Sequence, residues 1–557
     1  MTSPIAFSPS ILPQEMPAMT QGIIADPDTT ERAASLKAPS LPADTASISA
    51  QAQERAARTQ AASTTATEQR RAPLNMSEPP IEYREGTKTT LRGATTSGTL
   101  VEVSRKESSQ SAPADPPIED AAIPTEERNT VEHPASAYKT TLTRKNAPDL
   151  TLSFADTVIL QEATDGTTAV YYKEFDMTRT YGADGTVLQE TAGNTLTADA
   201  ASIIINVTAG SVHGGNGDNL VFNWANDTTI TTGDGNDTII LADDVSNVSI
   251  ATGGGNDRLS GNVIRNASID LGEGDNVFQA ALLENSSLRM GNGNNSVQGT
   301  SLVLTAKNAT LAFGDGNNTL YMNSTAASIS LGHGNNSGLF SLAGGTLTAG
   351  DGNNHFTLGL SGDASASLGN GANRLFAFVG DRAMLDIGNG NNGIFFSATD
   401  DAHITLGNGK NTFFLANASG SAGISVGGGN NFFGGLSLSG DVVFEVGGGN
   451  NKVSDAFLSG KIKLIFGDGN NELSLSKLLG DAVVRLGNGD NRVHVKEMEG
   501  NARLEAGNGN TAISIDRIAG DAGISRGTGS TVVVVGEATT TKALPKAYFR
   551  SDIHQAL

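Results

Sequence analysis

Residues 464–491 read LIFGDGNNELSLSKLLGDAVVRLGNGDN, and this stretch holds two copies of a glycine-rich turn that begin at Gly467 and Gly487. The same G-x-G turn, usually completed by two Asn or Asp residues, occurs seventeen times, at spacings of 18 to 23 residues. Self-similarity at a fixed period of this length indicates a stacked repeat architecture. The first glycines of the turns stand at positions 215, 233, 253, 272, 291, 314, 332, 350, 369, 388, 407, 427, 447, 467, 487, 507 and 527.

Apolar residues alternate with polar ones on both sides of each turn. The residue three before the first glycine is large and apolar in every repeat except at Ala366, and the residue six after it is apolar except at Gly338. A period of two is typical of strands with one buried face. A second corner appears in the later repeats as a Gly-Asp pair, for example Gly480-Asp481. Each repeat is therefore expected to form a strand, a Gly-Asn turn, a second strand and a corner.

One such coil alone has unpaired strand N–H and C=O groups and an uncovered apolar face, and a neighbouring coil satisfies both. The sequence therefore predicts an all-β protein dominated by a parallel β-solenoid of about 17 coils. At a coil spacing of about 4.8 Å, the stack would be roughly 80 Å long.

Four regions are expected along the chain. Residues 1–135 are rich in Ala, Ser, Thr, Pro and Glu, and we predict a disordered leader because such a segment buries too little apolar surface to offset its ordering entropy. Residues 136–205 carry short strand patterns and the hairpin signals Asp165-Gly166 and Asp184-Gly185, which predict a small β-rich cap. Residues 206–536 form the solenoid, and residues 537–557 form a C-terminal cap or tail.

The composition excludes several function classes. Lys and Arg number 37 against 59 Asp and Glu, a net charge of −22, so we expect no nucleic-acid partner, because such binding needs clustered positive charge. The chain has no cysteine, which excludes disulfides, thiolate metal sites and cysteine nucleophiles. We expect no transmembrane segment, because no run of 18 apolar residues occurs. The N-terminus lacks the pattern of a cleaved Sec signal, so any export would use another route.

The first turns resemble a known repeat family. Residues Ser211–Val221 (SVHGGNGDNLV) and Thr232–Ile239 (TGDGNDTI) are similar to the RTX, or haemolysin-type, nonapeptide G-G-x-G-x-D-x-(apolar)-x. That resemblance implies a parallel β-roll that binds calcium through turn carbonyl groups and the carboxylate at the sixth motif position. It also implies a secreted bacterial protein. The present chain differs from the family in carrying only one such turn per coil of about 20 residues.

Calcium is accordingly the expected cofactor of the first coils, and the candidate metal ligands are Asp218, Asp234, Asp237, Asp257, Glu273 and Asp275. Calcium prefers charged oxygen ligands, yet the sixth motif position is Asp only at Asp237 and Asp257. It is Thr at Thr511 and Thr531 and Asn in the thirteen other turns. The alternative is an asparagine ladder, in which stacked Asn side chains bond one another and the turn backbone without metal. The ladder is favoured for the later coils, and both alternatives stay open for the first four.

Catalytic motifs are sparse. None of the seven histidines begins H-E-x-x-H, which argues against a zincin protease. Carboxylate pairs of the kind that polysaccharide-active β-helix enzymes use occur at Asp400-Asp401 and at Glu497 with Glu499, although solvated charge on an outer face is the simpler interpretation. Three Phe-Phe pairs follow turns, at positions 395–396, 413–414 and 432–433. Alternation places one ring of each pair outward, and an exposed stripe of such rings would be the best binding surface.

These features predict an exported, non-enzymatic repeat protein with a structural, adhesive or host-contact role and an extracellular location. A host or matrix surface is the expected partner. The alternative from another class is an injected effector, because the Ser/Thr/Pro-rich leader resembles type III secretion leaders, and in that case a secretion chaperone is the expected partner of the leader. A β-helix enzyme acting on polysaccharides is the third possibility. The sequence does not indicate an oligomeric state.

Overall fold

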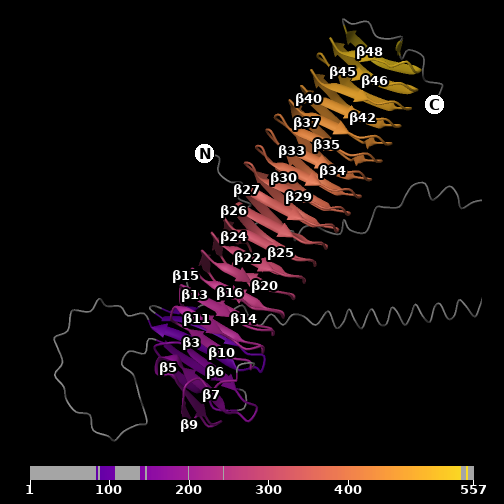
Figure 1. Ribbon diagram of the computed structural model, residues 1–557. Helices are drawn as coiled ribbons and strands as arrows, with labels where there is room; N and C mark the ends of the chain where they lie inside the picture. The colour runs from indigo at the N-terminus through magenta and orange to yellow at the C-terminus, as the bar shows by residue number, and fades with distance from the viewer. Residues whose placement is uncertain are drawn as a thin grey trace, which may run out of the picture. The chain divides into compact units, whose positions relative to one another are not determined.

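The computed structural model of the chain describes residues 83–85, 88–106, 138–144, 147–197, 200–242, 244–540 and 547–549. Regular structure in these ranges is β-strand except for a 3-10 helix, η3 (Lys173–Phe175). Within the same ranges, no helix is long and apolar enough to cross a membrane. Figure 1 shows the strands of residues 203–540 stacked as successive parallel coils, so the predicted β-solenoid is confirmed.

The strand after each turn pairs in parallel with the same strand of the next coil, in a register that matches equivalent repeat positions: Leu220 pairs with Thr238, and Thr238 with Arg258. Eighteen coils contribute, one more than the number of turns, because the first strand precedes the first turn. This post-turn ladder comprises β10 (Ile203–Asn206), β12 (Leu220–Asn223), β14 (Thr238–Leu241), β17 (Arg258–Ser260), β20 (Val277–Gln279), β23 (Ser296–Gln298), the first parts of β26 (Thr319–Leu331) and β27 (Ser337–Ala349), β28 (His355–Ser361), β30 (Arg374–Val379), β32 (Gly393–Ala398), β34 (Thr412–Ala418), β36 (Phe432–Phe433), β37 (Leu436–Gly440), β39 (Lys452–Val453), β40 (Ala456–Gly460), β42 (Glu472–Gly480), β44 (Arg492–Met498), β46 (Thr511–Gly520) and β48 (Thr531–Thr540).

A second ladder joins the strands that precede each turn. It comprises β11 (Gly210–His213), β13 (Thr228–Thr231), β16 (Ser249–Ala251), β19 (Ser268–Asp270), β22 (Ser287–Met290), β25 (Thr310–Phe313), the last parts of β26 and β27, β29 (Ser365–Leu368), β31 (Met384–Ile387), β33 (His403–Leu406), β35 (Gly423–Val426), β38 (Val443–Val446), β41 (Lys463–Phe466), β43 (Val483–Leu486), β45 (Arg503–Glu505) and β47 (Gly523–Ser525). The early coils add a short third strand, in β15 (Asp244–Ser246), β18 (Val263–Arg265), β21 (Leu282–Glu284) and β24 (Leu304–Lys307).

Inward side chains of all the coils form one continuous apolar core. Leu288, Leu311 and Ile329, which stand three residues before successive turns, are each at most 1% exposed. Alanines such as Ala364 and Ala402 are fully buried opposite larger side chains, because the interior between two sheets is narrow. The alternation of apolar and polar residues in the sequence therefore matches the alternation of buried and exposed side chains in the strands.

Both turn glycines are required by the stacking of the coils. At Gly409, the third residue of its turn, φ is +149°, and a Cβ would lie 1.9 Å from the carbonyl oxygen of Gly390 in the preceding coil. At Gly388, the first residue of its turn, a Cβ would lie 2.7 Å from the carbonyl carbon of Gly369. Side chains at these positions would push adjacent turns apart.

The N-terminal strands form a cap on the first coils. Strands β1 (Tyr83–Glu85), β2 (Lys88–Ala94), β3 (Leu100–Lys106), β4 (Tyr138–Thr143) and β5 (Leu150–Phe154) make one antiparallel sheet. Strands β6 (Val158–Glu162), β7 (Thr168–Tyr172), β8 (Met177–Tyr181) and β9 (Val187–Ala192) make a second, which continues the solenoid because β6 pairs antiparallel with β10. Their apolar side chains share a core with Phe222 and Ile240 of the first coils.

The predicted leader of residues 1–135 needs a correction, because β2 and β3 lie within it. Leu91, Val101 and Val103 of this hairpin are at most 3% exposed. The hairpin sequence is mostly polar and shows no sustained apolar period. Its few apolar side chains are buried because the other cap strands and the first coils cover them. The remainder of residues 1–135 lies outside the described residues.

The last coil is extended by strand pairing. Strand β49 (Ala547–Phe549) pairs in parallel with Val533–Val535 of β48. Pairing of this kind covers the edge that a terminal strand would otherwise expose. The other residues of the predicted tail beyond Thr540 lie outside the described residues.

One position at the corner opposite the turns predicts a stabilising substitution. Ala326 has φ of +52°, and the residues before and after it in the corner column, Asn308 and Gly344, are also left-handed. A left-handed alanine costs roughly 1–2 kcal/mol, whereas glycine adopts this conformation freely. Ala326→Gly should raise the free energy of unfolding by about 0.5–1 kcal/mol in urea titrations. The matched substitution at buried Ala327 should lower it, and equal effects at both positions would contradict the corner assignment.

Candidate functional site: the edge of stacked turns

The fifth residue of each turn, counted from its first glycine, is the sixth position of the nonapeptide motif. These residues build a buried ladder of mainly amide side chains. Asn392 is 1% exposed, and its Nδ2 donates to the carbonyl oxygens of Gly388 and Gly390 in its own turn, each at 3.2 Å. The same Nδ2 donates to Oδ1 of Asn411 in the next coil at 2.9 Å, and the backbone N–H of Asn392 donates to that Oδ1 as well. The amide thus pairs with two carbonyl groups of its own turn and with the next coil, and an unpaired polar group at this buried position would destabilise the fold.

The equivalent side chain is buried in each turn from Asn219 to Asn491, and it is an amide in thirteen of these turns. The ladder residues, which are each at most 2% exposed, are Asn219, Asp237, Asp257, Asn276, Asn295, Asn318, Asn336, Asn354, Asn373, Asn392, Asn411, Asn431, Asn451, Asn471 and Asn491. Beyond them the position is occupied by Thr511, whose buried hydroxyl has no hydrogen-bond partner. The asparagine ladder that the sequence offered as an alternative to calcium is therefore present.

Two exposed columns of side chains flank the buried ladder. In the second position of the turn, Oδ1 of Asn389 accepts the backbone N–H of Asn408 at 2.7 Å. In the fourth position, Oδ1 of Asn391 accepts the backbone N–H of Lys410 at 2.9 Å. Asp, Asn and His333, through its Nδ1, all serve as acceptors in these columns. Only an acceptor is needed here, so Asp and Asn are interchangeable.

The six predicted metal ligands are distributed over these three columns. Asp218 and Asp275 stand in the fourth-position column and accept backbone N–H groups from Asn236 and Asn294. Glu273 stands in the second-position column and accepts the N–H of Asn292. Asp234 occupies the same column, whereas Asp237 and Asp257 stand in the buried ladder.

The two buried carboxylates differ from the amides around them. Oδ1 of Asp237 accepts two bonds from Asn219, but its buried Oδ2 has no partner. Oδ2 of Asp257 accepts a bond from the Thr252 hydroxyl at 2.6 Å. Burial raises the pKa of Asp237, and burial, together with the charges of Asp237 and Asp218, raises the pKa of Asp257 to about 6.

This arrangement is a poor match for calcium, which takes six to eight oxygen ligands. In the described part of the chain, no three carboxylate or imidazole side chains are grouped so that they would hold a metal ion. Five of the six carboxylates, all except Asp234, already accept backbone hydrogen bonds, and among the six only Asp237 has a buried oxygen without a partner. Calcium in the first coils therefore stays a prediction that rests on Asp237 and Asp257.

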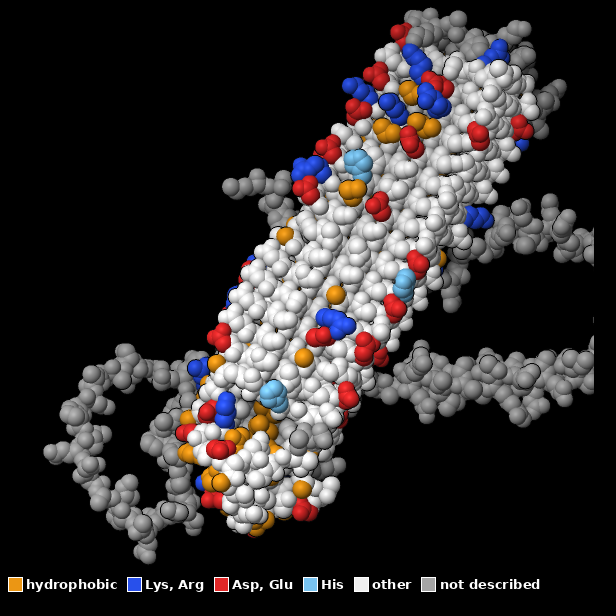
Figure 2. All heavy atoms as spheres, in the orientation of Figure 1, with side chains coloured by type: hydrophobic (Ala, Val, Ile, Leu, Met, Phe, Trp, Pro, Cys, Tyr) orange, Lys and Arg blue, Asp and Glu red, His pale blue; other side chains and the backbone are white. Residues whose placement is uncertain are grey.

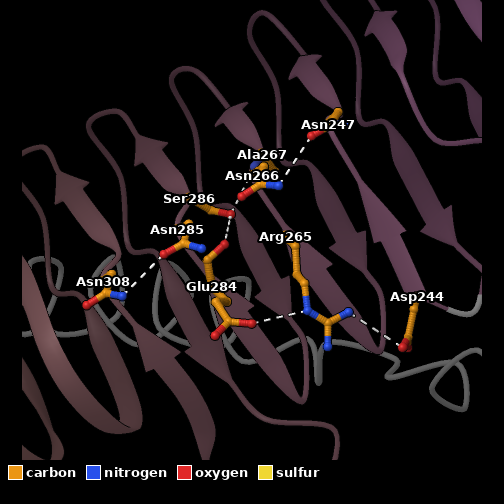
Figure 3. A network of polar contacts seen from close by, with 9 residues as sticks. All are labelled: Asp244, Asn247, Arg265, Asn266, Ala267, Glu284, Asn285, Ser286 and Asn308. Carbon is orange, nitrogen blue, oxygen red and sulfur yellow. Dashed lines mark hydrogen bonds and ion pairs between the residues drawn. The ribbon is translucent and has the colours of Figure 1, made fainter.

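A second ladder lies at the opposite corner of the first coils (Figure 3), and the sequence analysis missed it. Asn247 donates to Asp227, Asn266 to Asn247, and Asn308 to Asn285, over 2.8 to 3.3 Å. All five residues are left-handed, with φ between +47° and +57°. The signal was available, because Asn or Asp stands six residues before the first turn glycine in each of these coils.

Ion pairs between neighbouring coils cover the outer faces. Figure 3 shows Arg265 between Asp244 and Glu284, and Figure 2 shows charged side chains gathered at the C-terminal end of the stack. Of the two carboxylate pairs noted in the sequence, Glu497 and Glu499 both pair with Arg517. A hydrogen bond with Lys477 lowers the pKa of Glu497. Asp400 and Asp401 lie exposed at a corner.

The Phe-Phe pairs divide as the alternation predicted. Phe396, Phe413 and Phe433 are fully buried, whereas Phe414 is 65% and Phe432 38% exposed. Phe395 is partly exposed and stacks on Phe376 of the preceding coil at 4.5 Å between ring centroids.

Comparison of the chain with protein-family models, with curated proteins and with solved structures found no match. The RTX-like character of the turns therefore rests on the residues themselves.

Two neighbouring asparagines give a matched test of the buried ladder. Asn392→Asp removes the Nδ2 that donates to Gly388, Gly390 and Asn411 and buries a carboxylate, so it should lower the free energy of unfolding at pH 7 by about 1–3 kcal/mol. Asn391→Asp keeps the exposed acceptor for Lys410 and should change it by less than about 0.5 kcal/mol. Chemical denaturation of both variants measures the difference, and equal losses would contradict the ladder.

Asp257 predicts a pH dependence of stability. Its pKa is about 6 in the folded chain against 3.8 ordinarily, so the folded state holds this proton more tightly. The stabilisation is complete below about pH 4 and is lost as the pH rises through 6, by at most about 3 kcal/mol. Asp257→Asn should abolish that part of the pH profile and should leave the variant more stable than the wild type at pH 7. Superimposable profiles of the two proteins would refute this assignment.

Proposed function

We propose that this chain is an exported, non-enzymatic repeat protein whose solenoid is a stiff scaffold for contact with an extracellular surface. The observation that carries the proposal is the buried ladder, which links fourteen consecutive turns, from Asn219 to Asn471, each to the next. Together with two parallel strand ladders that run through the stack, it favours a unit that resists bending and shear. Such a unit presents long, regular outer faces.

The outer side chains support a scaffold role rather than chemistry. Glu497 and Glu499, which stand in the arrangement of paired carboxylates, both form ion pairs with Arg517. The column that contains Glu497 also holds Lys477, which pairs with it. Alternating charge along a column offsets self-repulsion in a chain of net charge −22. The RTX-like turns support an extracellular location.

Removal of whole coils tests the scaffold. Deletion of residues 427–486 joins Val426 to Gly487, so three repeats are lost and the phase of turn and strand is kept. The shortened chain should fold, and its solenoid should be about 14 Å shorter in solution scattering, because coils stack at about 4.8 Å. Deletion of residues 427–476, which breaks the phase, is the control and should aggregate. A three-coil deletion that unfolds would contradict independent stacking.

The location is tested separately. In the organism that produces the protein, an epitope inserted after Gly420, at an exposed corner, should be cleaved by protease added outside intact cells or should be found in the medium. An epitope that stays protected inside cells would overturn the export part of the proposal. An epitope that appears inside host cells instead would favour the injected effector.

A further inference from the structure

Eight asparagines of the chain are followed directly by glycine, and all eight lie in the stacked turns. In such a pair the glycine nitrogen can attack the carbonyl carbon of the asparagine side chain, because glycine has no Cβ to hinder the approach. The attack needs a free glycine N–H and a side chain that can rotate toward it. The pairs are Asn216-Gly217, Asn292-Gly293, Asn370-Gly371, Asn389-Gly390, Asn392-Gly393, Asn408-Gly409, Asn488-Gly489 and Asn508-Gly509.

The next coil holds both reacting groups in five of these pairs. At Asn389, Oδ1 accepts the backbone N–H of Asn408 at 2.7 Å. The N–H of Gly390 donates to the carbonyl oxygen of Asn408 at 2.8 Å. The side chain and the attacking nitrogen are therefore fixed together, although Asn389 is exposed. The same two bonds are made at Asn292, Asn370, Asn408 and Asn488 and at the glycines that follow them.

Two further pairs are held in other ways. Asn392 belongs to the buried ladder, and the N–H of Gly393 donates to the carbonyl oxygen of Asn373 at 2.8 Å. At Asn508, Oδ1 accepts both the N–H and the hydroxyl of Thr528, at 2.8 and 2.7 Å. Rotation of either asparagine side chain would therefore break hydrogen bonds.

The pair in the first turn is the exception. The Asn216 side chain is exposed and makes no hydrogen bond within the described residues. In the same part of the chain, the N–H of Gly217 has no hydrogen-bond partner. The carbonyl oxygen of Gly217 does accept a bond from Asn219 at 2.7 Å. The turn is thus fixed, while the two groups that would react are both free.

We propose that Asn216 is a site of spontaneous deamidation, which adds a carboxylate to the first turn. The nitrogen of Gly217 forms a bond to Cγ of Asn216, the Cγ–Nδ2 bond breaks, and Nδ2 leaves as ammonia with the proton of the Gly217 N–H. Water then opens the resulting succinimide at either carbonyl group. The product is aspartate or isoaspartate at position 216. Water is the only co-reactant.

The new carboxylate lies where acidic side chains already gather. Asp218 follows Asn216 by two residues, and Asp234 occupies the equivalent position in the next turn. A Cβ built on Gly233 would clash with Oδ1 of Asn216, so the Asn216 side chain lies against that next turn. Deamidation therefore raises the negative charge of the turn edge by one, close to Asp234.

The test ages the folded full-length chain at mildly alkaline pH and follows each Asn-Gly pair by peptide mapping with mass spectrometry. Asn216 should be modified at least about tenfold faster than Asn389, because two hydrogen bonds must open at Asn389 before its side chain can react. In urea that unfolds the chain, the two pairs should react at similar rates. Equal rates in the folded chain, or an unmodified Asn216 beside modified inner pairs, would overturn the proposal.

Two variants assign the modification to its site. Glutamine has one more methylene and forms the corresponding cyclic imide far more slowly. Asn216→Gln, at an exposed side chain without bonds, should fold as the wild type does and should lose the acidic shift that the aged wild type develops in isoelectric focusing. Asn389→Gln is the matched control and should keep that shift. An acidic shift of full size in aged Asn216→Gln would contradict the assignment. The scaffold proposal is unaffected, because it depends on coil deletion and on the epitope's location.

Discussion

The structure depends on the pairing of one buried amide per coil. The ladder column at the turn edge is buried, so the polar groups around it must find partners within the protein. An asparagine side chain supplies a donor to its own turn, a donor to the next coil and an acceptor for the preceding one. Asn392 and its neighbours use all three. The two glycines of the turn exist because the coils must approach closely enough for these bonds.

Since the interior and the turn edge hold the coils in register, the outer positions are free to vary. One outward column carries Tyr321, Thr357 and Phe395 in different coils, and another carries the ion pair of Lys477 with Glu497. The cap protects one end by pairing β6 with β10. Function in such a molecule is expected on lateral faces, which are set by sequence without consequence for the core.

The sequence predicted the solenoid because each coil repeats a local pattern, and neither the period nor the alternation depends on distant contacts. Positions such as Leu288 therefore appeared as core directly. The cap hairpin at Leu91 and Val101 was missed because its apolar face is completed by residues far along the chain. The roles of the turn carboxylates were also missed. The sequence shows a carboxylate at Asp275, but it does not show that this carboxylate accepts a backbone N–H from the next coil. Phe414 is an extra residue in the pairing of β32 with β34, and the repeat spacing alone did not predict which residue would be extra.

Asn and Asp have nearly the same shape but make opposite demands at the turn edge, since a carboxylate needs a proton or a cation where an amide needs neither. We therefore expect the coils with Asn in the buried ladder to hold together without metal. Thermal unfolding of the full chain, followed by circular dichroism in EDTA and in millimolar calcium at pH 7, tests this claim most directly. We predict β-rich spectra in both buffers and little difference in melting temperature. A chain that unfolds in EDTA and folds when calcium is added would contradict it.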